Sequence, residues 1–416
     1  MTSKEKLQKC LAHESGPVPM DFGGTAVTGI HCSVVEALRA HYGLEKRPVK
    51  IIDPYQMLGE IDNDLREVIG IDVVGVFPRN TLFGFPLGSW KEWRTPWDQE
   101  VLVSENFNTT QQGEDVLIYP EGDTSVPASG RMPGSGYFFD SIVRQPPIEE
   151  EKLNPVDNLE EFGYVSDEDL DYYESALREA DATGLGVIAN FGGTAFGDIA
   201  LVPAPFLKNP KGIRDVTEWY VSTVMRPEYI HAIFEGQSEI AIANLEKIFQ
   251  RVGNLPDAVF ICGTDFGTQD SQFCSTDTYN TLYAPYYKKV NNWIHEHTEW
   301  KTFKHSCGAV LPFMEHFIDS EFDIINPVQC SAAGMDPQNL KDSYGDRLVF
   351  WGGGVDTQNT LPFGTPDEVK KEVTERLEIF TRDGGYVFDA IHNVQAKTPI
   401  ENMAAMFDAV RKFRSN

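Results

Sequence analysis

An imidazole and a thiol stand two residues apart at the end of an apolar run. Residues 300–303 form the run, and the sequence Lys-His-Ser-Cys-Gly follows it, which places His305 and Cys307 at positions i and i+2. In an extended backbone such positions face the same side, so both side chains can reach one point. A neutral imidazole and a thiolate are ligands that suit Zn²⁺. Because a His-x-Cys pair alone is a weak signal, a buried pair without metal is the alternative.

Other potential ligands also follow apolar runs. Residues 322–329 precede Cys330, residues 347–354 precede Asp356, and the last run of the chain ends at His392. If these runs are parallel strands, their ends meet on one rim. Three protein ligands and an open fourth position are typical of catalytic zinc. Either Cys330 or His392 can complete such a set: the thiolate would add negative charge, and the imidazole would keep the metal more electrophilic.

Further polar side chains are expected on the same rim. Asp265 follows residues 258–263, and its carboxyl group could act as a general acid or base or anchor a substrate, although a loop-capping role explains it equally well. Side chains expected to orient a polar substrate are Gln269, Gln329, Asp356 and Gln395.

The elements that must position these groups alternate between short apolar runs and helical patterns. Eight runs read as strands: residues 18–22, 71–77, 186–190, 258–263, 300–303, 322–328, 347–351 and 386–391. A helical segment separates each run from the next, including one predicted over residues 53–69. Eight β–α units predict a single α/β domain over residues 1–416, a (β/α)8 TIM barrel with its functional groups at the strand C-termini.

Residues 78–147 interrupt this pattern after the second strand. They are rich in Gly, Pro and Trp, and residues 101–107 and 116–119 alternate like antiparallel strands, with residues 112–115 as the turn between them. We therefore expect a β-rich insertion that forms a lid or pocket wall, and whose removal leaves a folded barrel. The aromatic residues 137–139 indicate an aromatic or methyl-ether substrate bound near Tyr137, or else the core of the small sheet.

Composition narrows the class of protein. The chain has 416 residues, 63 acidic against 35 basic side chains, and a formal charge of −28. Such a charge argues against nucleic acid and anionic membranes as partners. Six scattered cysteines do not form a disulfide framework, and no apolar run is long enough to span a membrane, so we expect a cytoplasmic protein.

Several motifs of the second half are similar to those of the uroporphyrinogen decarboxylase superfamily, and within it to the zinc-dependent corrinoid methyltransferases. They are Gly263-Thr264-Asp265-Phe266-Gly267-Thr268-Gln269, His305-Ser306-Cys307-Gly308, Asn326-Pro327-Val328-Gln329, Trp351-Gly352-Gly353-Gly354-Val355-Asp356, and His392-Asn393-Val394-Gln395 followed by Thr398-Pro399-Ile400-Glu401-Asn402. The resemblance covers the chain from about residue 258 to its end, is weaker over residues 1–77, and is lost in the insertion.

This resemblance implies a TIM barrel and a zinc methyltransferase, such as an O-demethylase, that moves a methyl group between a small-molecule donor or acceptor and a corrinoid (cobalamin) carried by a partner protein. The true decarboxylases of the superfamily carry an arginine-rich loop for porphyrin carboxylates, whereas residues 18–24 contain no arginine. His392 stands where the methyltransferases have their third ligand, a cysteine. The alternatives are a metal-free, decarboxylase-like lyase and a non-catalytic tetrapyrrole or corrinoid binder.

Overall fold

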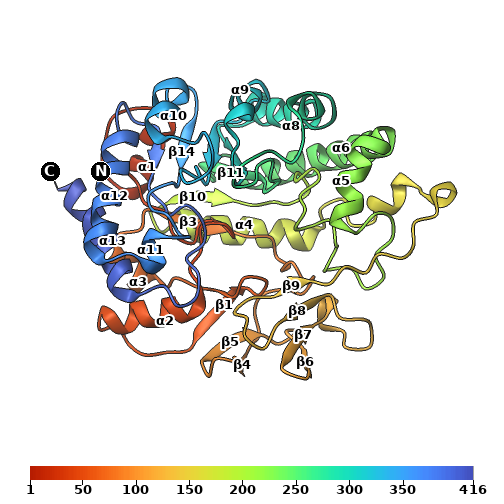
Figure 1. Cartoon of the computed structure of the whole chain (residues 1–416), viewed down its shortest axis with the longest axis horizontal. Helices are drawn as coiled ribbons and strands as arrows, with labels where there is room; N and C mark the ends of the chain where they lie inside the picture. Colours follow the sequence, from red (N-terminus) through yellow and green to blue (C-terminus); the bar gives the residue numbers. More distant parts are fainter. Residues whose placement is uncertain (416) are drawn as a thin grey trace.

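A parallel sheet forms the centre of the computed structural model, which describes residues 1–415 (Figure 1). Its strands are, in spatial order, β15 (Tyr386–Val387), β14 (Val349–Trp351), β13 (Ile324–Asn326), β12 (Lys301–His305), β11 (Ala258–Cys262), β10 (Gly186–Ala189) and β3 (Val73–Val76). Every neighbouring pair is parallel. Seven of the eight predicted strands are therefore confirmed.

The eighth predicted strand lies between the two edges of this sheet. The backbone N–H of Asp21 donates to the carbonyl of Phe388 (2.9 Å), beside β15, and Phe388 N–H donates to Pro19 (2.8 Å). On the other side, Asp72 N–H donates to the carbonyl of Met20 (2.8 Å), just before β3. Backbone hydrogen bonds thus connect β15 to β3 through residues 19–21, and the sheet curls into a TIM-barrel-like α/β fold.

Helices connect the strands and cover the outside of the sheet (Figure 1). They are α1 (Ser3–Leu11), α2 (Cys32–His41), α3 (Asn63–Ile69), α4 (Asp167–Asp181), α5 (Val216–Met225), α6 (Pro227–Val252), α7 (Thr276–Thr278), α8 (Ala284–His297), α9 (Met314–Asp319), α10 (Pro337–Tyr344), α11 (Thr360–Phe363), α12 (Pro366–Phe380) and α13 (Ile400–Arg414). The start of α12 has a capping box, in which Thr365 and Glu368 satisfy each other's backbone N–H groups. No helix in residues 1–415 is both long and apolar enough to cross a bilayer.

Apolar side chains fill the barrel interior at the end where the strands begin. Phe303 and Trp351 pack edge to face at 5.3 Å between ring centroids. Leu7 of α1 belongs to the same buried cluster. Helix α1 therefore closes the N-terminal end of the barrel interior with apolar side chains.

Residues 90–141 form short strands beside the barrel, at the bottom of Figure 1. One sheet has the order β2 (Leu58–Gly59), β1 (Val49–Asp53), β5 (Glu100–Ser104), β4 (Trp90–Arg94). The other has the order β6 (Thr109–Gln112), β7 (Asp115–Ile118), β8 (Gly130–Met132), β9 (Asp140–Ser141). The first sheet combines strands from both sides of β3, so residues 78–147 are joined to residues 49–59 by strand pairing, and their expected role as a lid or pocket wall stays a prediction.

Two local predictions were wrong. The helix expected over residues 53–69 begins only at Asn63, because the preceding residues form β1 and β2, and β1 pairs with the distant β5 (Val49 opposite Val101). The turn at residues 112–115 joins β6 to β7. It does not join residues 101–107 to 116–119, since β5 pairs instead with β4 and β1. In the first place, a strand partner far along the chain decides the structure.

A buried carboxylate holds the closure of the barrel together. Asp72 is 2% exposed and accepts hydrogen bonds from Met20 N–H (3.0 Å), Lys6 Nζ (2.9 Å) and Arg414 Nη2 (2.5 Å). The Arg414 guanidinium also donates to the carbonyl of Gly70 (2.9 Å). The first strand, β3 and the two terminal helices therefore meet at one charged group.

We predict that Asp72→Ala lowers the free energy of unfolding by about 3–5 kcal/mol, because it leaves the cations of Lys6 and Arg414 without their buried partner. Asp181→Ala is the matched control: its carboxylate pairs with Lys4 at 2.5 Å but is 39% exposed. The control should lose less than about 1 kcal/mol. Urea unfolding measures both, and equal losses in the two variants would contradict the assignment.

Candidate metal centre

Three of the predicted ligands meet at the C-terminal end of the barrel. His305 ends β12, Cys307 follows in the next loop, and His392 follows β15. Their ligand atoms all lie within 4.8 Å of one another. His305 Nε2 is 3.2 Å from Cys307 Sγ, and the rings of His305 and His392 have centroids 5.2 Å apart. Within residues 1–415, no other set of three or more His, Cys, Asp or Glu side chains has this spacing.

A hydrogen bond to Asn326 orients the His305 ring. Asn326 ends β13; its Nδ2 donates to the carbonyl of Trp351 (2.8 Å), so its Oδ1 is left to accept from His305 Nδ1 at 2.6 Å. This pattern places the proton of a neutral His305 on Nδ1 and leaves the lone pair of Nε2 facing Cys307. Outer partners of this kind fix the ring orientation of metal-binding histidines.

Burial sets the charge state of the three side chains. Burial lowers the pKa of His305 to about 4, and it lowers the pKa of His392 to about 4, an effect to which the neighbouring His305 adds. Burial also raises the pKa of the Cys307 thiol well above its usual value. Two neutral imidazoles can bind a cation directly, and a bound cation would favour the thiolate of Cys307.

Asp265 lies beside this cluster and is tied to its loop. Its Oδ1 accepts from the backbone N–H of Cys307 (2.7 Å) and lies 3.9 Å from His305 Nε2. Burial raises the pKa of Asp265, while its hydrogen bond from the backbone N–H of Cys307 acts in the opposite direction. The carboxyl group is therefore held next to the ligands, as a general acid or base would have to be.

The two predicted amides near the cluster bind backbone and each other. Gln329 Oε1 accepts from Gly308 N–H (2.8 Å), and its Nε2 donates to Gln269 Oε1 (2.9 Å). Gln269 Nε2 in turn donates to the carbonyl of Ser331 (2.7 Å). This chain links the loops after β11, β12 and β13, so the amides hold the loops around the cluster.

Cys330 lies outside the cluster. The chain turns at Val328, which has a positive φ of 55°, and Cys330 Sγ then donates to the Val328 carbonyl at 3.3 Å and lies 4.0 Å from the Gly353 carbonyl. Burial raises the pKa of its thiol to about 12. Of the two predicted third ligands, the structure brings His392 to the pair and leaves Cys330 apart.

Three other predicted site residues have local partners. Asp356 accepts from the backbone N–H of Gln358 (2.7 Å) and so caps its own loop, and Gln395 Nε2 donates to the Asn393 carbonyl at 3.3 Å. The ring of Tyr137 packs against Trp97, with 5.1 Å between centroids. None of these three contacts involves His305, Cys307 or His392, so the roles expected for the three residues at a substrate stay predictions.

Two residues of this region were missed by the sequence reasoning. Asp198 is 8% exposed; burial raises its pKa to about 6, and the charge of Asp265 contributes to the rise. Tyr220 stacks on Phe273 (5.1 Å, 14°), and its buried hydroxyl has no hydrogen-bond partner in the described chain. Both lie well beyond the end of β10, in the long connection to α6, where a search for polar residues at strand ends does not reach.

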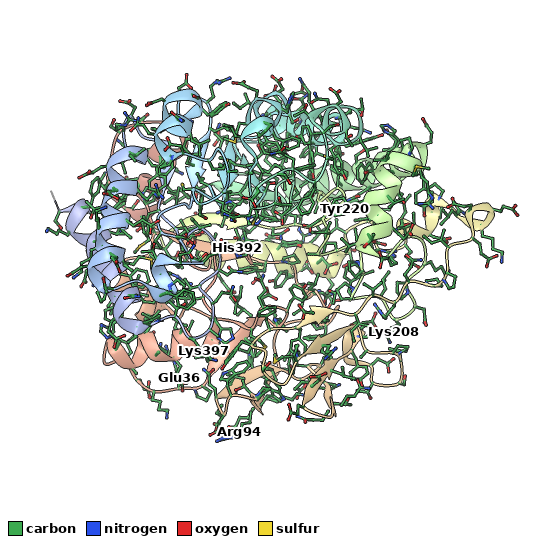
Figure 2. The ribbon with its side chains drawn as sticks, viewed as in Figure 1. Glu36, Arg94, Lys208, Tyr220, His392 and Lys397 are labelled. Atoms are coloured by element: carbon green, nitrogen blue, oxygen red, sulfur yellow. The ribbon has the colours of Figure 1, made fainter. Side chains whose placement is uncertain are left out.

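The small sheets contact the loops at the same end of the barrel. His31 Nε2 lies 3.0 Å from the Tyr137 carbonyl, and Asn393 Nδ2 donates to Gln56 Oε1 (2.8 Å). Arg144 donates to carbonyls of the loop after β10. Figure 2 shows His392 near the middle of the view, above these sheets, and Tyr220 to its right on α5. The β-rich segment therefore borders the end of the barrel that carries the cluster.

Comparison with protein families identifies one match. A family model described as uroporphyrinogen decarboxylase (URO-D) matches residues 202–413, which include the strands β11 to β15 and all three clustered side chains. No curated protein matches the sequence significantly.

Comparison with solved structures finds a full-length likeness. A methyltransferase from Methanosarcina mazei superposes with a TM-score of 0.55 at 15% identity, over 99% of this chain and 99% of that one. A D-psicose 3-epimerase in the presence of D-fructose gives a TM-score of 0.33 at 9% identity over 58% and 81% of the two chains, a likeness on which nothing rests. At these identities the likeness to the methyltransferase shows the fold alone.

The role of Asn326 can be tested by metal binding. We predict that Asn326→Ala weakens the binding of zinc by about 10–100-fold, because His305 loses the partner that fixes its ring. Asn326→Asp keeps an acceptor and should bind zinc more tightly than the alanine variant. Asn359→Ala is the control, since Asn359 Nδ2 only bonds to Asp356 (3.0 Å). Competition with a chromogenic chelator gives the dissociation constants. An unchanged zinc dissociation constant in Asn326→Ala would contradict the role of Asn326 in orienting His305.

Proposed function

The chain belongs to the uroporphyrinogen decarboxylase family, and from this premise we propose that it is a zinc-dependent methyltransferase that moves a methyl group between a small molecule and a corrinoid (cobalamin) protein. The observation that carries the proposal is the cluster of His305, Cys307 and His392, whose ligand atoms lie within 4.8 Å of one another. The full-length likeness to a methyltransferase fold is consistent with it.

The donor set fits zinc. Two imidazole nitrogens and one sulfur are a mixed set that Zn²⁺ accepts in tetrahedral geometry, and three protein ligands leave one position for a substrate atom. His305 Nε2 has a free lone pair because Asn326 accepts from Nδ1. Zinc bound there would act as a Lewis acid toward the oxygen or sulfur that carries, or receives, the methyl group.

The remaining side chains of the site have roles that their contacts support. Asp265, held by Cys307 N–H, is the acid–base group that we assign to the proton of the departing or attacking heteroatom. Gln329 and Gln269 hold the three surrounding loops in place. The β-rich segment, which borders the same end, would keep water from the reacting groups as a lid or wall.

The charges near the cluster favour methyl transfer over porphyrin decarboxylation. Asp265 and Asp198 are carboxyl groups, and the charge of Lys304 is enclosed by aromatic rings. A polyanionic porphyrin would need exposed cations, which these residues do not supply. A neutral methyl ether or thioether has no need of such cations.

Of the aromatic residues 137–139, Phe139 is fully buried in the small-sheet core, so only its neighbours could contact such a substrate.

Metal analysis of variants tests the proposal. We predict about one zinc per chain in gently purified protein. Cys307→Ala and His392→Ala should lose zinc and methyl transfer together, with a melting temperature close to that of the wild type, because the ligands lie in loops outside the barrel core. Cys330→Ala is the matched control and should keep its zinc. Methyl transfer is followed as methylcobalamin formed from added Co(I) cobalamin and an aryl methyl ether or a methyl thioether.

Two results would contradict this account. Wild-type protein that purifies without zinc would favour one of two alternatives: a metal-free lyase, or a protein that binds a tetrapyrrole or corrinoid without catalysing a reaction. Loss of zinc in Cys330→Ala with retention in His392→Ala would assign the third ligand to the cysteine instead.

A further inference from the structure

A fully buried lysine lies next to the cluster on β12. Lys304 is 0% exposed and stands between Phe303 and His305. Because side chains alternate along a strand, its side chain leaves the barrel on the opposite face from these two neighbours, toward the helices. Its Nζ lies over four aromatic rings, at 4.8 Å from the centroid of Phe266, 5.3 Å from Tyr287, 5.1 Å from Phe317 and 5.6 Å from Phe322.

The ammonium group donates to the loop after β11 and to the end of β12, the two segments that carry Asp265 and His305. Lys304 Nζ donates to the carbonyl of Thr264 (3.1 Å), the residue before Asp265, and to the carbonyl of His305 (3.3 Å). Its third acceptor is Cys262 Sγ at 3.3 Å. None of these acceptors is a carboxylate, so the charge is held by two carbonyl dipoles, a sulfur and the faces of the rings.

Such a group is expensive to bury. Removing an ammonium ion from water is destabilising unless the ion is paired and hydrogen-bonded, and a methionine of similar length would fill this space without that loss. Packing alone therefore does not explain a lysine here. Both backbone carbonyls accept a hydrogen bond from Lys304 Nζ, and a methionine side chain has no N–H group to donate to them.

We propose that Lys304 is a positioning residue for the metal centre. It holds the loop of Asp265 against the end of β12, where the proposed ligand His305 lies. Two other bonds join the same loops: Cys307 N–H donates to Asp265 Oδ1 (2.7 Å), and Phe266 N–H donates to Ser306 Oγ (2.9 Å). Lys304 is the one cation of this set, and it acts through backbone carbonyls. The inference rests on the proposed zinc site and adds to it the residue that sets its geometry.

The test compares Lys304→Met with Lys304→Gln. Methionine keeps the packing and removes both the charge and the donors, and glutamine keeps a donor that is too short to reach both carbonyls. We expect the zinc dissociation constant to rise about tenfold in Lys304→Met and by less in Lys304→Gln. With Co²⁺ in place of zinc, the visible absorption bands should shift in both variants, since they report the ligand geometry directly.

Lys301→Met is the matched control. Lys301 lies on the same strand, at its far end, and pairs with Asp323 at 3.1 Å. It should keep the wild-type dissociation constant and Co²⁺ spectrum even if its melting temperature falls.

The outcomes separate the two proposals. If the wild type binds neither zinc nor Co²⁺, the proposed function and this inference both fail. If the wild type binds metal and either folded Lys304 variant keeps its affinity and spectrum, Lys304 only fills the core and this inference alone is overturned. Should the methionine variant fail to fold, the glutamine variant decides by the same criterion.

Discussion

Curling of the parallel sheet is the constraint on which the rest of the structure depends. β12 and β15 are separated by β13 and β14, so in a flat sheet their ends would lie about 14 Å apart at the usual strand spacing. In the barrel, the ligand atoms of His305 and His392 come within 4.8 Å. Residues 19–21 maintain this curvature because they hydrogen-bond to both edges of the sheet. The network at Asp72 is thus remote from the site, yet it supports the site's geometry.

Around the cluster, polar groups serve mainly to hold one another. Asn326 orients His305, Asp265 binds the Cys307 loop, and the two glutamines link three loops. Within our proposal, a centre with one thiolate and two imidazoles retains a positive charge, whereas a second thiolate would neutralise it. A cationic centre suits the activation of a weakly basic ether oxygen, and a neutral ether needs no exposed cations around the site.

Periodicity was sufficient to predict seven strands of the barrel and to bring two of the predicted ligands, His305 and Cys307, together. Each barrel strand is an apolar run followed by a helical pattern, and His305 and Cys307 end one of these runs, so their common direction follows from local rules. The third ligand was different, because Cys330 and His392 both follow strands. The choice depends on how each loop turns, and the positive φ of Val328, which no pattern of residue types predicts, turns Cys330 away. The strands β1 and β2 were missed for a related reason: β1 pairs with β5, which lies far along the chain, and β2 pairs with β1.

X-ray absorption at the zinc edge of the wild-type protein tests the central claim most directly, because it counts the atoms bound to the metal. We expect a first shell with two imidazole nitrogens at about 2.0–2.1 Å, one sulfur at about 2.3 Å, and one further light atom. A shell with two sulfurs, or with oxygen atoms alone, would contradict a centre built from His305, Cys307 and His392.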